Sequence, residues 1–93
     1  MAEPQVHTFD STGEAYDASQ CDDNIVDGDV LAVPTERVVG FLFEAWPVAV
    51  TVDVGVFHTA TDLADMVTDP KRRASYDKAA EIARTHDLEV QVP

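Results

Sequence analysis

A chain of 93 residues is short enough to form one domain and long enough to bury a single hydrophobic core. Hydrophobic residues make up 45% of it, which indicates a folded protein despite a net charge of −12. The 18 carboxylates against 6 Lys and Arg argue against direct binding to nucleic acid or to anionic membranes, because such binding depends on basic side chains.

The sequence also bears on location and cofactors. Cys21 is the only cysteine, so no internal disulfide is possible, and the first residues lack the apolar run of a signal peptide. Residues 38–56 are the most apolar stretch, but Glu44 and Asp53 interrupt it. We therefore expect a cytoplasmic protein with no cofactor, an unknown protein partner and an oligomeric state that the sequence leaves open.

The N-terminal part is predicted to hold one helix. Residues 1–10 form either a flexible N-terminus or a short strand near Val6, and residues 11–93 form a single α+β domain. Ser11 and Glu14 have the spacing of a capping box, in which the glutamate reaches back to the cap's own amide. This predicts a helix over residues 12–20.

Strands are predicted in the middle of the chain. A turn at residues 27–29 leads into a strand at 30–33, and Pro34 then closes a hairpin onto residues 37–43. Valine at every second position predicts a third strand over residues 48–56. We expect Pro47 to break the ladder before it. A turn at residues 53–55 that returns 56–58 as a fourth strand is the alternative.

The last third changes to helical spacing. Thr59 or Thr61 is expected to cap a short helix through Val67, and Asp69 with Pro70 to begin a longer helix ending near His86. Residues 88–92 alternate again and would complete the sheet. The predicted class is α+β: a small, mainly antiparallel sheet of 3–5 strands with an N-terminal helix and two C-terminal helices on one face.

Four aspartates between Cys21 and Val30 are weak candidates for a metal site. An EF-hand with Gly28 at its sixth position would put Ile25 and Pro34 where oxygen ligands are needed. A polar turn explains the segment better, so we expect no metal and no catalytic residues. The candidate ligands are Asp22, Asp23, Asp27 and Asp29.

Two features are candidates for binding a partner or an anion. Lys71, Arg72 and Arg73 hold half of the positive charge at the start of a helix, where free amides also attract anions. Pairing of Arg73 with Asp69 and Asp77 is the alternative. Trp46 lies just before Pro47 and is the aromatic residue most expected at the surface.

Two resemblances can be stated. The segment VTDPKRRASYDKAAE resembles the last helix of J-domain cochaperones. The His-Pro-Asp tripeptide that those proteins need is absent from the chain, so we interpret the likeness as a shared way of capping a helix. The segments STGEAYDASQCDDNI, DGDVL and EAWPVAVT resemble small uncharacterised proteins of high-GC actinobacteria and their phages or plasmids, which implies no activity.

Three hypotheses follow. The first is a small acidic protein, not an enzyme, that binds or regulates a protein partner and originates from a mobile element. The second is a DNA mimic that inhibits a nucleic-acid-binding protein, with carboxylates standing in for phosphates. The third is a small ligand-binding or enzymatic domain that uses Cys21, His58 or the basic residues 71–73.

Overall fold

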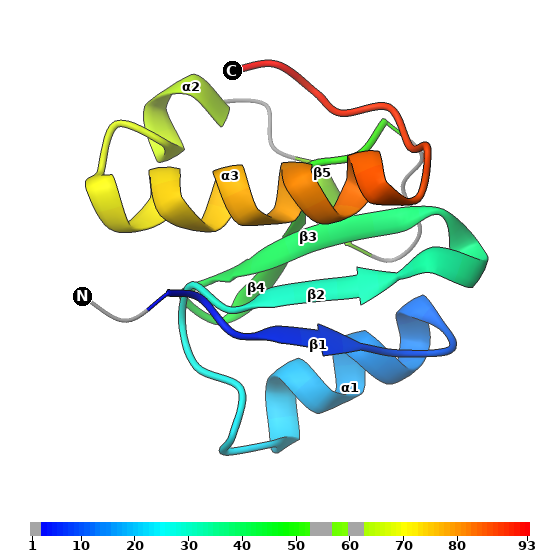
Figure 1. Ribbon diagram of the computed structural model, residues 1–93. Coiled ribbons are helices and arrows are strands. Elements are labelled where there is room, and N and C mark those ends of the chain that lie inside the picture. Colours follow the sequence, from blue (N-terminus) through cyan, green and yellow to red (C-terminus); the bar gives the residue numbers. More distant parts are fainter. Residues whose placement is uncertain (1–2, 53–56, 60–62) are drawn as a thin grey trace.

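The computed structural model describes residues 3–52, 57–59 and 63–93 and has the predicted α+β class (Figure 1). Five strands and three α-helices are assigned in this part of the chain. In chain order the elements are β1 (Val6–Thr8), α1 (Thr12–Cys21), β2 (Val30–Val33), a 3-10 turn (Pro34–Glu36), β3 (Val38–Phe43), β4 (Trp46–Ala49), β5 (His58–Thr59), α2 (Leu63–Met66) and α3 (Pro70–Thr85).

The sheet has the order β1-β2-β3-β4-β5, antiparallel at its centre and parallel at both edges. The predicted hairpin of β2 and β3 is present and pairs Val33 with Val38. Parallel neighbours need a crossover connection. Between β1 and β2 this connection contains α1, so β1, α1 and β2 form a β-α-β unit. Of the two alternatives for residues 1–10, a short strand near Val6 is the one present.

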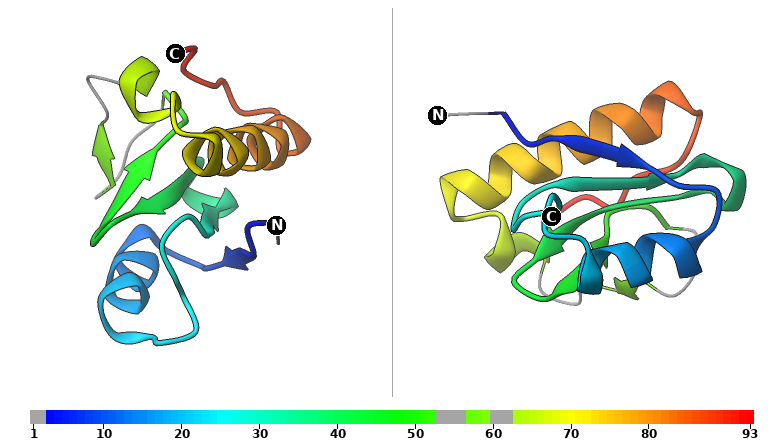
Figure 2. Two further views of the ribbon diagram at one scale, coloured as in Figure 1. Left: turned by 90° about the vertical axis from the view of Figure 1, so that its left-hand side faces the viewer. Right: turned by 90° about the horizontal axis from the view of Figure 1, so that it is seen from below.

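Helices cover both faces of the sheet (Figure 2). Alternate residues of each strand point to opposite faces. Val30 and Phe41 thus join the core beneath α3, whereas Leu31 and Leu42 join the core beneath α1. The two C-terminal helices contribute to the same core, as expected, but α1 packs on the opposite face. Both faces of β2 and β3 are apolar, so one layer of helices would leave the other face in water.

Pro47 does not break the ladder, contrary to our expectation. It lies within β4, buried opposite Leu42 of β3. The Leu42 amide donates to Asp29 O, and the Leu42 carbonyl accepts from the Gly28 amide. The backbone N–H and C=O of Leu42 thus bond to residues 28 and 29 and not to β4. The pairing with Leu42 therefore needs no N–H from Pro47.

The strand predicted over residues 48–56 is shorter than expected. β4 ends at Ala49, and Thr51 forms a single antiparallel bridge with Val90. Residues 88–92 therefore touch the sheet at this bridge instead of adding a strand. The predicted turn at 53–55 lies outside the described residues, whereas His58 does begin a short strand, β5.

Two of the predicted helix caps are confirmed, and the third is not tested by the described residues. Ser11 caps α1, and Asp69 caps α3 by accepting from the Lys71 amide at 2.9 Å. Glu14 reaches the amide of Asp10 rather than that of Ser11. For α2, Thr61 lies outside the described residues and Thr59 belongs to β5. None of the helices in the described ranges has the length and apolar character needed to span a membrane.

Candidate functional site

The predicted turn at residues 27–29 is present and brings the aspartate-rich segment against α3. The Asp29 amide donates to Val26 O at 3.0 Å. Gly28 has a φ of +94°, which glycine adopts without strain. A side chain at Gly28 would also come within 3.2 Å of Lys71 and Ser75. The turn thus depends on glycine both for its backbone angle and for its fit to the helix.

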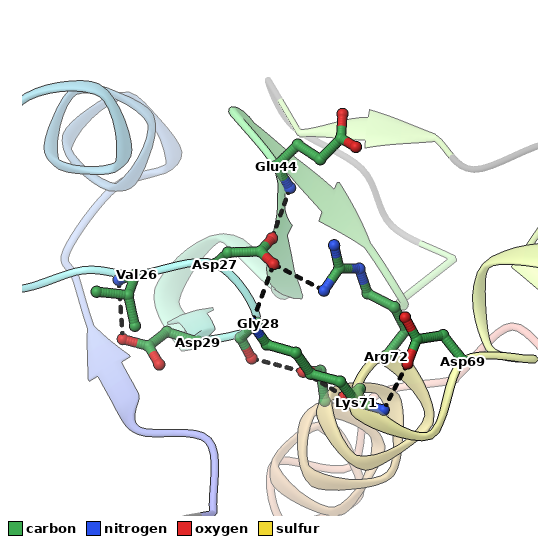
Figure 3. A network of polar contacts seen from close by, with 9 residues as sticks. Val26, Asp27, Gly28, Asp29, Glu44, Asp69, Lys71 and Arg72 are labelled. Carbon is green, nitrogen blue, oxygen red and sulfur yellow. Dashed lines mark hydrogen bonds and ion pairs between the residues drawn. The ribbon is translucent and has the colours of Figure 1, made fainter.

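Asp27 is the centre of a polar cluster that joins this turn to two other elements (Figure 3). Its carboxylate lies 2.7 Å from Arg72 Nη1 and 3.2 Å from Lys71 Nζ on α3. It also accepts the amide of Glu44 at 2.7 Å, while the Glu44 side chain points away (Figure 3). We call Asp27, Lys71, Arg72 and the Glu44 amide the Asp27 clasp.

Electrostatics in the clasp favour the charged carboxylate. Partial burial by itself raises the pKa of Asp27. The Glu44 amide and the two cations together outweigh that effect, so the pKa lies below its ordinary value. Asp27 is therefore ionised at neutral pH and balances the charge of Arg72.

Arg72 is held more firmly than a surface arginine. Its side chain is 12% exposed, and its guanidinium lies 4.6 Å from the centre of the Phe43 ring. Such stacking on an aromatic ring adds to the ion pair. Its Nε is buried without a hydrogen-bond partner in the described part of the chain. The arginine thus packs as part of the body of the protein.

The predicted anion site is consequently filled by a carboxylate of the chain itself. Lys71 and Arg72 both contact Asp27, whereas Arg73 points elsewhere and pairs with Asp77 at 3.2 Å. Of the two pairings considered as the alternative for Arg73, the one with Asp77 is therefore observed. The helix start binds the 26–29 turn by charge, which explains why Lys71 and Arg72 stand at its unfavourable end.

Asp29 forms a second contact between turn and sheet. It is 4% exposed and accepts from two backbone amides. Its Oδ2 lies 2.9 Å from Nε2 of His7 on β1. Asp29 thereby links the edge strand to the start of β2. Neither His7 nor this partnership was predicted, since the two residues are separated by 22 positions and belong to no motif.

The four candidate metal ligands do not converge. Asp27 and Asp29 have the partners given above, while Asp22 and Asp23 are exposed beyond the end of α1. Asp22 accepts the amide of Asn24 at 2.9 Å, as is typical of a polar turn. No group of three or more metal-ligating side chains occurs among residues 3–52, 57–59 and 63–93. Cys21 is exposed.

Trp46 is at the surface, as predicted, and lies next to the clasp. It pairs with Phe43 across the β3–β4 hairpin, so the two side chains are on the same face of the sheet. Its ring packs edge-on against His58 of β5, with 4.9 Å between ring centres and 77° between planes. The indole remains 48% exposed. Phe43 therefore lies between Trp46 and Arg72. Nothing in the sequence indicated that these two candidates lie near one another.

A cavity of about 420 Å³ lies between the N-terminal segment, the 26–29 turn and the start of α3. Its walls include Pro4, Val26 and Ala74, and its polar lining consists of Glu3, Gln5, Asp27, Asp29, Lys71 and Ser75. The Ser75 hydroxyl is already used, because it donates to Gly28 O at 2.6 Å. The volume is that of a pocket for a small molecule.

Charge is distributed unevenly between the two sides of the sheet. Five of the six Lys and Arg lie on α3, and residues 1–36 contain none. Glu36 is engaged internally: the amide and hydroxyl of Thr12 donate to it and hold its pKa below the ordinary value. The exposed carboxylates on and beside α1 form what we call the α1 acidic surface: Asp10, Glu14, Asp17, Asp22 and Asp23.

Comparison with known proteins finds no matching family model, no similar curated protein and no similar solved structure.

Proposed function

We propose that this chain is a small acidic interaction module, not an enzyme, which binds and regulates a protein partner through the α1 acidic surface. One observation carries the proposal: α1 and its flanking turns expose carboxylates where no Lys or Arg is near in the sequence, while α3 holds five cations on the other side of the sheet. A surface of one sign attracts partners of the opposite sign.

The internal ion pairs support this division of roles. Asp27, Asp29 and Glu36 have partners within the chain, so their charge serves the fold. Asp17 and Asp23 are exposed and have no polar side-chain partner among the described residues. A basic partner would meet these carboxylates first. We place this interaction in the cytoplasm, and an origin in a mobile element remains part of the proposal.

DNA mimicry is the second candidate, and the same surface favours it. Glu14 and Asp17 are three residues apart on α1, so their side chains lie on one side of the helix. A row of this kind would suit a basic groove that normally holds phosphates. The two candidates differ in one outcome: a mimic competes with nucleic acid for its partner. The cavity beside α3 similarly supports the third, ligand-binding candidate.

The test uses a matched pair of triple variants. Asp17→Asn, Asp22→Asn and Asp23→Asn together remove three charges from the α1 acidic surface and keep an oxygen for the Asn24 amide. Asp65→Asn, Asp87→Asn and Glu89→Gln remove three exposed charges elsewhere. Both variants and the wild type would be used as bait in nuclease-treated lysate of the native host, and retained proteins would be quantified.

We expect a basic protein that the wild type and the control variant retain and that the α1 variant loses. Elution of the same protein by added salt would agree with an electrostatic interface. Competition by duplex DNA would select the mimic. Equal retention by both triple variants would refute the proposal, because the interaction would then not depend on the α1 acidic surface.

A further inference from the structure

Trp46 is an exposed aromatic side chain that the strands hold in a defined position. Its backbone is fixed in β4 by pairing with β3, and its ring is fixed by the edge-on contact with His58. An exposed ring that is already ordered loses little conformational entropy on binding. Such tryptophans are enriched among the residues that dominate binding energy.

The neighbouring ring shows which group an aromatic face on this surface accepts. Phe43, the cross-strand partner of Trp46, has the Arg72 guanidinium 4.6 Å from its centre. Asp27 lies 2.7 Å from Arg72 and 3.2 Å from Lys71, so its carboxylate offsets part of their positive charge. A cation that approaches Trp46 is therefore repelled less by Arg72 than it would be if Arg72 had no carboxylate beside it.

The charge around Trp46 and on the whole chain favours a cation as well. Glu44 is exposed in the turn immediately before β4, and its side chain points away from the clasp (Figure 3). The net charge is −12, so a cationic segment is attracted from a distance and an anionic one is repelled. Tryptophan is also the aromatic side chain that binds cations best.

We propose that Trp46 anchors the protein partner by stacking on an arginine of a basic segment. This rests on the proposed function and names the chemistry of the partner: a flexible or exposed segment rich in arginine. Arginine is preferred over lysine because its planar guanidinium stacks on an aromatic face. Trp46 lies on the α3 face of the sheet, opposite α1. The end of α1 nevertheless reaches the turn beside it, because Gln20 Nε2 donates to Ala45 O at 2.7 Å. The α1 acidic surface therefore attracts the segment past this turn, and Trp46 provides the contact that salt does not screen.

The test uses the fluorescence of Trp46, the single tryptophan of the chain. The probes are three short peptides that alternate glycine with arginine, lysine or citrulline, the last being uncharged and similar in shape to arginine. Affinities would be measured by isothermal titration calorimetry at low and high ionic strength for the wild type and for Trp46→Ala, Trp46→Phe and Val52→Ala, since two of these variants have no tryptophan. Val52 is the control, because it is 49% exposed but is not aromatic.

We expect the arginine peptide to change the Trp46 emission and to bind more tightly than the lysine peptide, with no binding of the citrulline peptide. Trp46→Ala should weaken the arginine peptide by about three- to tenfold, and the difference should persist at high salt. Trp46→Phe should lie between, and Val52→Ala should match the wild type. Circular dichroism would verify that each variant is folded.

Unchanged Trp46 emission at saturation, or equal affinity for Trp46→Ala and wild type, would overturn the inference. If the α1 triple variant still lost its partner, the proposed function would stand and only the role of Trp46 would fall. If the peptide bound through Trp46 but the partner did not depend on the α1 acidic surface, the proposed function would fall instead.

Discussion

Asp27 connects three parts of the chain that lie far apart in the sequence. Through one carboxylate it contacts α3 at Lys71 and Arg72 and the β3–β4 turn at Glu44. Exposed ion pairs contribute little to stability. Asp27 contributes more to stability than such a pair, because it also accepts a backbone amide and because Arg72 is mostly buried. Loss of Asp27 would leave this guanidinium without its counter-charge.

We predict that Asp27→Asn lowers the free energy of unfolding by about 1 kcal/mol at pH 7. The amide keeps an oxygen for the Glu44 N–H but loses the charge that Arg72 needs. Urea denaturation of wild type and variant would measure the difference. Asp77→Asn, which removes the exposed partner of Arg73, is the control and should cost no more than a few tenths of a kcal/mol.

The pH dependence of this difference follows from the direction of the pKa shift. The pKa of Asp27 is below its ordinary value of 3.8 in the folded protein. Its contribution is therefore fully present above that value and is lost as the pH falls through the lower, folded pKa. Wild type and Asp27→Asn should converge in stability once the pH has fallen below the folded pKa. A difference that is constant from pH 7 to acid would contradict the assignment of the charge.

At the scale of elements, local signals in the sequence identified the helix starts and one hairpin. The caps at Ser11 and Asp69 and the turn at Pro34 need only a few neighbouring residues to form, so their spacing predicts them. The β3–β4 hairpin carries no such signal. Its two-residue turn is Glu44-Ala45, with Glu44 at a φ of 56°, where glycine or asparagine would be expected.

Contacts between distant residues explain what the sequence could not predict. The position of Pro47 is tolerated because Leu42 directs its polar groups to Gly28 and Asp29. The Asp27 clasp likewise joins residues 27 and 71, which no motif relates. The candidates Arg72 and Trp46 were identified separately, from charge at a helix start and from the position before Pro47. Their shared neighbour Phe43 depends on the strand register.

Strand β3 contains a position where only glycine fits. A Cβ on Gly40 would lie 2.3 Å from Val48 O and 2.9 Å from a ring carbon of Phe57. The first of these atoms is backbone of the adjacent strand and cannot move without shifting β4. We predict that Gly40→Ala lowers the free energy of unfolding by about 2–3 kcal/mol, measured by urea denaturation.

The matched control for this prediction is Gly13→Ala in α1. A Cβ at Gly13 meets only Ser11 Oγ at 3.8 Å, and alanine favours a helix. This variant should be at least as stable as the wild type. If Gly40→Ala were equally harmless, the close approach of β4 and Phe57 to β3 would be wrong.

At the scale of the whole molecule, the excess of carboxylates opposes folding. The chain has 18 acidic and 6 basic side chains, so repulsive contacts between carboxylates outnumber attractive ion pairs. Folding brings these charges closer together and strengthens the repulsion. Screening shortens the range of the repulsion from about 30 Å at 0.01 M salt to about 3 Å at 1 M. Salt also weakens the exposed ion pairs of α3, such as Arg73–Asp77, but these are fewer than the unpaired acids.

We therefore predict that the midpoint of thermal unfolding rises with sodium chloride between these concentrations. The α1 triple variant should be more stable than the wild type at low salt and should gain less from added salt, because part of the repulsion has been removed. The control triple variant removes the same number of negative charges. A larger increase in low-salt stability for the α1 variant than for this control would therefore locate the repulsion at the α1 acidic surface. A midpoint independent of salt in all three proteins would mean that the carboxylates are too dispersed to repel one another, and the argument for an attractive acidic surface would lose its physical basis.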